Sequence, residues 1–310
     1  MKLSRLIVTS LAGMSVVALF AGATFLAERA AAQSPMANPS PSQIAARARA
    51  RSPRHLLRSA GSGLVDPSPI PAGWTCTGNC GTDGADGAVT LSPAGSGAYE
   101  WVSTSGGVGG VGALPTGALG SETDGSTLTT PVFSAPAGTA LNFYFNYVTS
   151  DGGGFADYAW AELFSASNTP VALLFTARTG SSGGIVPGAG LPAPLATLTP
   201  ASVPIIGGAP TWLPLGGSSG QCWASGCGYT GWIKSNYTIS SSGDYYLKVG
   251  VVNWSDESFD SGLAVDGVTV GGVPVGQPTP TPTLSTWGMI LLGGALLLFG
   301  MKAAVSNATA

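Results

Sequence analysis

Two short acidic segments could gather side-chain oxygens around a cation. Residues 150–157 carry two aspartates and three consecutive glycines, and residues 256–261 carry three acids ahead of Asp266. Glycines let backbone carbonyls turn toward an ion, and Ca²⁺ takes about six to eight oxygen ligands. The alternative is that these aspartates cap turns and keep the surface soluble. The predicted calcium ligands are Asp151, Asp157, Asp256, Asp260 and Asp266.

Aromatic side chains offer a second chemistry, the binding of sugars. Tryptophan and tyrosine rings present an apolar face to the C–H surface of a sugar and a polar tip to its hydroxyls. Residues 222–232 place Trp223, Tyr229 and Trp232 around a pair of cysteines. We predict that these three rings bind a glycan, and the alternative is that they pack against the disulfide as part of the core.

Catalysis finds little support in the sequence. Glycoside hydrolysis needs two carboxyl groups that flank a sugar bond, and the spacing of the acids selects no such pair. The G-x-S-x-G match at residues 216–220 needs a histidine partner, and the one histidine, His55, lies far away in a basic segment. We therefore predict a non-enzymatic protein. The alternatives are a surface polysaccharide hydrolase that uses a carboxylate pair and a purely structural coat component.

Four cysteines form two local pairs, Cys76 with Cys80 and Cys222 with Cys227. An even number of cysteines in an exported chain indicates disulfides, and local pairing is the simplest of three possible connectivities. Four thiolates on zinc are the alternative. The spacings do not match the usual zinc knuckle, in which two residues separate the ligands.

Short apolar runs separated by glycine-rich turns dominate the middle of the chain. Glycine accounts for 47 of the 310 residues, and only 9% of residues are charged. Such runs are typical of strands, and Gly-Gly, Ser-Gly and Asp-Gly pairs between them indicate turns. We predict an all-β domain over residues 61–276, an antiparallel β-sandwich of the jelly-roll or lectin-like kind. The predicted strands are 140–148, 158–164, 170–178, 244–252 and 261–270.

Two inserts interrupt this pattern. Residues 103–120 are dominated by Gly, Ser, Val and Ala, and we expect a mobile loop there. Residues 180–220 are rich in Gly and Pro and contain no charge. A loop of this length is functional or loosely ordered, and Trp212 with the neighbouring cysteine pair is expected to pin it partly to the domain.

The N-terminal segment predicts export. Residues 1–32 combine Lys2 and Arg5 with an apolar run and small residues before Gln33, which is typical of a signal peptide. Residues 33–60 carry five arginines and no acid, and we expect a basic flexible linker there. The domain at 61–276 has the opposite charge, with three basic residues against fourteen acidic ones. Nucleic acid is excluded as a partner, because its phosphates would repel this domain.

The C-terminal segment predicts a membrane helix. A Pro/Thr linker at residues 277–282 is followed by a tail at 283–310. Residues 287–305 carry a single charge, Lys302, and at about 1.5 Å per residue they just cross the roughly 30 Å hydrocarbon core of a bilayer. The expected fold therefore includes an N-terminal signal helix and a C-terminal transmembrane helix beside the sandwich.

The tail also resembles a known sorting signal. The run Thr-Pro-Thr-Leu-Ser-Thr-Trp-Gly at residues 281–288 is similar to the IPTL-CTERM signal, itself related to the PEP-CTERM tails of Gram-negative bacteria. Thr281 stands where the family has isoleucine, and Lys302 alone stands for its basic cluster. Residues 259–270 resemble the closing strand of lectin-type sandwiches that carry such tails. The matching recognition residues are Pro282, Thr283, Leu284, Ser285, Trp287 and Gly288.

The resemblance implies an exosortase-type processing enzyme as a partner. It also implies anchoring in the inner membrane before processing, followed by delivery to the cell surface or the extracellular matrix. Combined with the residues above, it leads us to expect a membrane-tethered or sorted surface protein. We expect this protein to be non-enzymatic, to bind surface glycans and to be stabilised by calcium.

Overall fold

The computed structural model describes residues 69–180 and 185–276. The predicted signal peptide, basic linker, Pro/Thr linker and sorting tail lie outside the described residues, so both predicted terminal helices stay predictions. Within the described part of the chain, no helix has the length and apolar character needed to cross a membrane.

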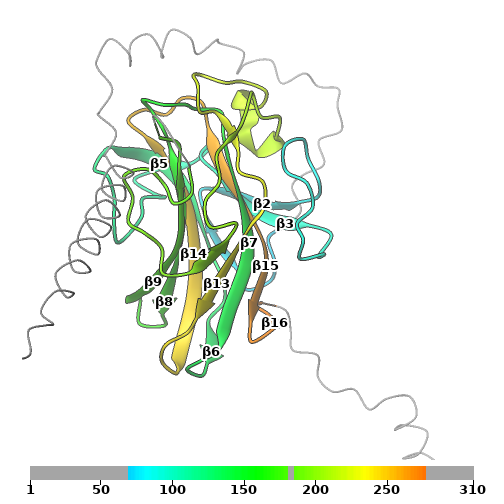
Figure 1. Ribbon diagram of the computed structural model, residues 1–310, viewed down its shortest axis with the longest axis vertical. Helices are drawn as coiled ribbons and strands as arrows, with labels where there is room; N and C mark the ends of the chain where they lie inside the picture. The colour runs from blue at the N-terminus through cyan, green and yellow to red at the C-terminus, as the bar shows by residue number, and fades with distance from the viewer. Residues whose placement is uncertain (1–68, 181–184, 277–310) are drawn as a thin grey trace, which may run out of the picture. The chain divides into compact units, whose positions relative to one another are not determined.

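The described residues form two antiparallel sheets that pack face to face (Figure 1). The 7-stranded sheet has the order β1-β5-β14-β8-β9, with β4 paired to β5 and β6 paired to β14. Its strands are β1 (Thr75–Thr77), β4 (Val108–Gly109), β5 (Glu122–Thr129), β6 (Phe133–Ala135), β8 (Tyr158–Ser165), β9 (Pro170–Arg178) and β14 (Gly243–Trp254).

The 9-stranded sheet has the order β10-β13-β7-β15-β3-β2, with short strands β11, β12 and β16 at its margins. A 3-10 helix, η2 (Leu213–Ser218), lies beside it. Its strands are β2 (Asn79–Asp83), β3 (Tyr99–Ser103), β7 (Ala140–Thr149), β10 (Thr197–Thr199), β11 (Ile206–Gly207), β12 (Gly228–Tyr229), β13 (Ile233–Thr238), β15 (Ser261–Val270) and β16 (Val273–Pro274). The prediction of an all-β antiparallel sandwich is confirmed, while its jelly-roll or lectin-like assignment stays a prediction.

Alternation along the strands builds the main core between the sheets. On β7, Leu141, Phe143, Phe145 and Tyr147 are fully buried in this core, because every second side chain of a strand faces the same way. Phe145 stacks on Phe175 of β9, with ring centroids 3.7 Å apart. This contact joins one sheet to the other across the core.

Two smaller apolar clusters cover parts of the outer faces. On the 9-stranded sheet, Trp212 beside η2 packs with Tyr99 and Trp101. On the 7-stranded sheet, Leu114 packs with Trp160 and Trp254, among others. The expectation of a mobile loop at residues 103–120 is therefore wrong for this segment. Leu114 is fully buried and β4 pairs with β5, so the insert is packed onto the sheet.

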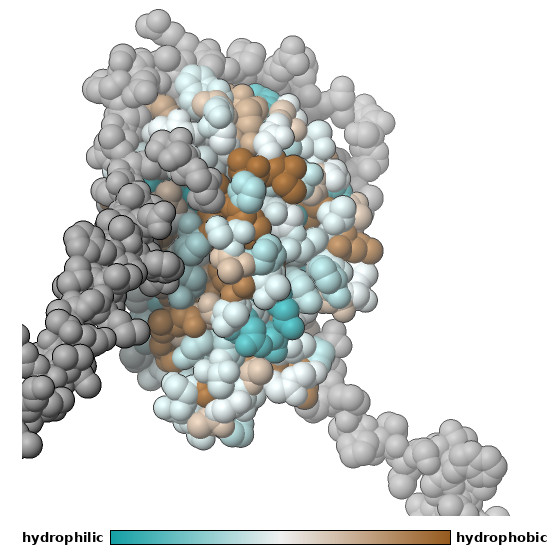
Figure 2. Space-filling view, viewed as in Figure 1, coloured by the Kyte–Doolittle hydropathy of each residue, from teal (hydrophilic) through white to brown (hydrophobic). Residues whose placement is uncertain are grey.

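The surface is mixed in character. Figure 2 shows apolar and hydrophilic side chains interspersed on one side of the molecule, with a compact hydrophilic patch in the lower half of the view. The two disulfides, Cys76–Cys80 and Cys222–Cys227, follow the predicted local pairing, and the described residues contain no free cysteine.

Candidate functional site

Three loops meet at one end of the sandwich, the upper end in Figure 1, and we call this region the loop end. They are residues 150–157 between β7 and β8, residues 219–227 after η2, and residues 255–260 between β14 and β15. Backbone hydrogen bonds join them. The amide of Trp223 donates to the Ser150 carbonyl over 2.9 Å, and the amide of Ser150 donates to the Asp260 carbonyl over 3.1 Å.

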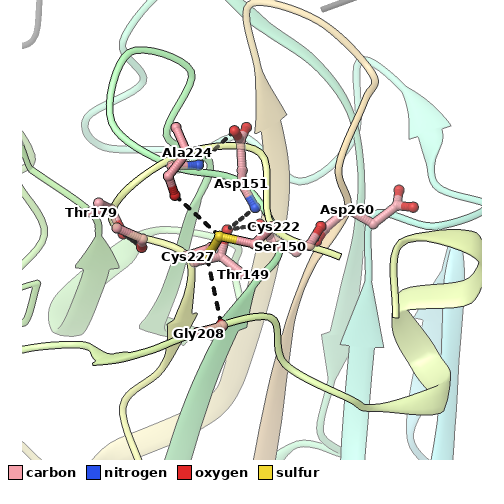
Figure 3. The surroundings of a disulfide bond; sticks show 12 residues. Thr149, Ser150, Asp151, Thr179, Gly208, Cys222, Ala224, Cys227 and Asp260 are labelled. Carbon is pink, nitrogen blue, oxygen red and sulfur yellow. Dashed lines mark hydrogen bonds between the residues drawn. A yellow bond between two sulfur atoms is a disulfide. The ribbon is translucent and has the colours of Figure 1, made fainter. Parts of the chain in front are cut away.

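The Cys222–Cys227 disulfide closes the central loop into a hairpin that lies directly on residues 150–157 (Figure 3). The contact is close at Gly152, where an added Cβ would lie 2.6 Å from the Ala224 carbonyl oxygen. The amide of Gly153 donates to the Ser225 carbonyl over 2.9 Å. The glycine run that suggested a cation loop therefore serves the close approach of two backbones.

Three aromatic rings gather at the loop end. Trp223 is half-buried, with Phe155 edge-on at 6.3 Å and Phe259 tilted at 5.4 Å between ring centroids. Phe259 has a φ of +62°, in the left-handed region that a bulky residue rarely adopts. Such a conformation costs about 1–3 kcal/mol and persists only where its surroundings enforce it. The loop thus holds the phenyl ring against Trp223 despite the strain.

Four of the five aspartates predicted to bind calcium lie in these loops. Asp157 accepts hydrogen bonds from the Trp254 amide at 2.9 Å and from the Ser261 hydroxyl at 2.7 Å. Asp260 accepts from Ser218 at 2.7 Å and from Thr104 at 3.3 Å. These two buried carboxylates therefore hold the loops to the strands by accepting hydrogen bonds.

The other two loop aspartates lie closer to their own backbone. Asp151 accepts from the Gly152 amide at 2.7 Å, and in Figure 3 its carboxylate points toward Ala224. Asp256 accepts from the Ser258 amide at 2.8 Å. Among residues 69–180 and 185–276, no group of three His, Cys, Asp or Glu side chains is arranged to hold a metal ion.

Asp266, the fifth predicted ligand, lies elsewhere. It is six residues beyond Asp260 on the extended strand β15, a separation of about 20 Å. Its buried carboxylate accepts hydrogen bonds from the hydroxyls of Ser92 and Ser96 and from the Gly267 amide. The five predicted ligands therefore do not converge on one point.

The three predicted sugar-binding rings are also separated. Tyr229 and Trp232 are half-buried against the apolar cluster on the outer face of the 9-stranded sheet. The Trp232 indole donates to the Thr90 carbonyl over 2.8 Å, and its ring lies edge-on to Tyr99 at 5.8 Å. Trp223 packs instead with Phe155 and Phe259, so the three predicted rings belong to two different groups.

Arg178, at the end of β9, was not predicted as part of this region. It is 1% exposed, and its guanidinium lies 4.6 Å from the centre of the Trp254 ring. Its Nε donates to the Ala156 carbonyl over 2.8 Å, which fixes the residue next to Asp157. Burial lowers the pKa of Arg178, while the Asp157 charge opposes that shift. The sequence did single out Arg178 in one way, because it is one of just three basic residues in the predicted domain.

No protein-family model and no curated protein matches this sequence. Among solved structures, the K1 cleaved adhesin domain of Lys-gingipain from Porphyromonas gingivalis W83 aligns at 14% identity, over 65% of this chain and 91% of its own, with a TM-score of 0.30. The K3 cleaved adhesin domain of the same protein aligns at 12% identity, over 65% and 92%, with a TM-score of 0.31. A CBM4 structure aligns at 9% identity, over 64% and 93%, with a TM-score of 0.27. Alignments this weak carry no argument about function.

The glutamates lie in separate environments. Glu162 on β8 accepts from Thr116 at 2.6 Å, and burial raises its pKa. Glu122 on β5 is also partly buried, yet the Tyr158 hydroxyl and backbone amides that bond to its carboxylate hold its pKa below the usual value. The two carboxylates therefore have different donors, Thr116 for Glu162 and Tyr158 with backbone amides for Glu122.

Glu100 on β3 gives the fold a pH dependence. Burial, with a smaller contribution from the Asp266 charge, raises the pKa of Glu100 from 4.5 to about 7. The folded state therefore binds a proton that the unfolded chain releases above pH 4.5. The stability from this group is complete below that pH and is lost as pH rises through about 7.

We expect Glu100→Gln to stabilise the full-length chain at pH 8 by about 1–2 kcal/mol, allowing for partial exposure of the carboxyl, and to change little at pH 4. Urea unfolding of both proteins at the two pH values measures the difference. An equal effect at pH 4 and pH 8 would contradict the assignment, because glutamine and protonated glutamate are both neutral.

Proposed function

We propose that this chain is an exported, non-enzymatic surface or matrix protein whose β-sandwich binds a glycan at the loop end. The observation that carries the proposal is Trp223, a half-buried ring held by Phe155 and Phe259 in a disulfide-closed hairpin. Four aspartates lie in the same loops. An aromatic ring takes the C–H face of a sugar, and the half-buried Asp256 is the loop carboxylate placed to accept hydrogen bonds from its hydroxyls.

Two further features support this proposal. Disulfides persist in oxidising compartments, so the two disulfides favour an exported protein. The spacing of the acids along the sequence selects no carboxylate pair, which favours a binding protein over the hydrolase alternative.

Replacing Trp223 with alanine is expected to weaken glycan binding at least tenfold while the fold is retained, because a half-buried ring contributes to the ligand more than to the core. The full-length chain and the variant are compared on an array of bacterial and plant polysaccharides. Tyr246→Ala is the matched control, since Tyr246 is a half-buried ring that stacks on Phe164, away from the loop end. Equal binding by all three proteins would place the glycan elsewhere, and no binding to any glycan would favour a structural coat component.

We keep calcium stabilisation as part of the proposal, with Asp151, Asp157, Asp256 and Asp260 as the residues that would hold the ion. The support is the gathering of these four acids at one end, since a nearby divalent cation offsets the repulsion between like charges. Calcium is expected to raise the melting temperature by several degrees, measured by calorimetry with magnesium as the control. No shift when excess EDTA is added to calcium-loaded protein would exclude this part.

The location follows from the two ends of the chain, which lie outside the described residues. We propose that an exosortase-type enzyme recognises the 282–288 motif while the tail is in the inner membrane, and that the domain then reaches the cell surface or the extracellular matrix. Mass spectrometry of the mature C-terminus tests this step. An intact C-terminus at Ala310 on the surface protein would show that the tail is an anchor instead.

A further inference from the structure

The outer face of the 9-stranded sheet is covered over one half only. Nearest the loop end it lies under η2 and the cluster around Trp212. Farther along the same strands, the half-buried side chains of Asn142 and Tyr144 on β7 and of Lys234 and Asn236 on β13 remain partly exposed. We call these four residues the β7–β13 face. Figure 2 shows a compact hydrophilic patch over β13 and β7 in the lower half of the view.

The strand register arranges these side chains in two rows. Lys234 pairs with Tyr144, and Asn236 pairs with Asn142. On the neighbouring edge strand β10, the exposed residues Thr199 and Thr197 extend the two rows. The strands lie about 4.8 Å apart and the rows about 7 Å apart, so the hydrogen-bonding groups form a flat grid.

The side chains of this grid keep hydrogen-bonding groups available. The Asn236 amide nitrogen donates to the Asn142 amide oxygen, which fixes both carboxamides. Among residues 69–180 and 185–276, no hydrogen-bond partner is found for the Asn142 amide nitrogen, the Asn236 amide oxygen or the Tyr144 hydroxyl. One edge of the Tyr144 ring lies near Gly267, where an added Cβ would be 3.7 Å from Tyr144 Cδ2 and 2.5 Å from the Cβ of Ala94, so Ala94 closes that side of the face.

The chemistry of this face matches an uncharged polyol. A fixed amide donor beside a fixed amide acceptor complements two neighbouring hydroxyls, each of which both donates and accepts. The Tyr144 ring offers an apolar surface to a sugar C–H face, and Lys234 donates to hydroxyl oxygens. Three basic residues stand against thirteen acids in 69–276, so the domain as a whole repels polyanions.

We infer that the β7–β13 face is a second glycan-binding site, which takes a neutral polysaccharide laid across β13 and β7. This inference rests on the proposed function, because both take the ligand to be a glycan. It assigns the binding to different residues from those of the loop end. The two sites lie on separate parts of the sandwich, so their contributions to binding can be measured separately.

Affinity electrophoresis of the full-length chain through gels that contain mannan, xylan or dextran tests the inference, with alginate as the anionic control. We expect at least one neutral polymer to retard the chain, and Tyr144→Ala and Asn236→Ala each to raise its Kd at least tenfold. Tyr246→Ala is the matched aromatic control, and circular dichroism checks that each variant is folded.

The outcomes separate the two sites. Retardation lost with Trp223→Ala but kept with Tyr144→Ala and Asn236→Ala overturns the inference and leaves the proposed loop-end function standing. The reverse pattern supports the inference and overturns the loop-end assignment. Retardation by alginate alone, abolished by salt, overturns the neutral-polysaccharide class, and no retardation by any polymer overturns both proposals.

Discussion

Replacing Asp157 with alanine is expected to destabilise the folded chain by about 3–5 kcal/mol, as removal of one member of a buried charged network does. The carboxylate is 1% exposed and accepts from the Trp254 amide and the Ser261 hydroxyl. Its loss leaves both donors buried without this acceptor, at a cost of about 1–3 kcal/mol each. It also removes the negative charge beside the buried Arg178 guanidinium.

Urea unfolding of the full-length chain at pH 7 measures this change. Asp244→Ala is the matched control, because Asp244 is an exposed aspartate whose carboxylate accepts from Ser134 on the neighbouring strand. The control is expected to change stability by less than about 0.5 kcal/mol. Equal effects of the two variants would contradict the assignment of Asp157 as a buried anchor of the loops.

The Asp157 result also bears on the calcium proposal. If the loss of stability is the same with calcium and with EDTA, hydrogen bonds to the chain account for the role of Asp157. If calcium stabilises the parent and not the variant, Asp157 contributes to an ion site as well. The same pair of proteins therefore separates the two interpretations of this aspartate.

Local pattern was sufficient to predict the main strands and the disulfides. The five predicted strands are β7, β8, β9, β14 and β15, because alternation along a strand follows directly from burial of one face. The cysteine pairing followed from an even count and short spacing. The meeting of residues 150–157 and 255–260 could also be expected, since each loop joins two of the predicted strands.

Sequence proximity misled the prediction where the chain is extended. Asp266 is only six residues from Asp260, but an extended strand converts that interval into about 20 Å. Tyr229 and Trp232 are likewise close to Trp223 in the sequence, but they pack against the cluster on the outer face of the 9-stranded sheet, whereas Trp223 packs with Phe155 and Phe259. The packing of residues 103–120 was missed because Leu114, a fully buried leucine, is isolated among small residues that carry no periodicity.

On the outer face of the 7-stranded sheet, the largest loss of stability is expected from substitution of Trp160. The side chain is fully buried, and its indole donates to the Gly112 carbonyl over 2.7 Å, which ties the 103–120 segment to the sheet. Trp160→Ala is expected to destabilise the full-length chain by about 3–5 kcal/mol, through lost burial and a residual cavity. Urea unfolding measures the change.

Gly250 on β14 is the partner that makes this position testable. An added Cβ would lie 2.6 Å from Cζ2 and 2.8 Å from Nε1 of the Trp160 ring. Gly250→Ala is therefore expected to cost about 1–3 kcal/mol by overpacking. Gly109→Ala on β4 is the control, because an added Cβ there meets nothing within 4 Å, and we expect a change below about 0.5 kcal/mol.

The double variant, Trp160→Ala with Gly250→Ala, tests whether contact with the Trp160 ring causes the destabilisation by Gly250→Ala. Once Trp160 is alanine, the new methyl group at position 250 enters the space that the ring occupied. The destabilisation of the double variant is therefore expected to be smaller than the sum of the two single destabilisations by at least about 1 kcal/mol. Strict additivity would mean that Gly250→Ala acts through the β14 backbone instead of the ring. A shortfall would show that the fully buried tryptophan requires the glycine opposite it on β14.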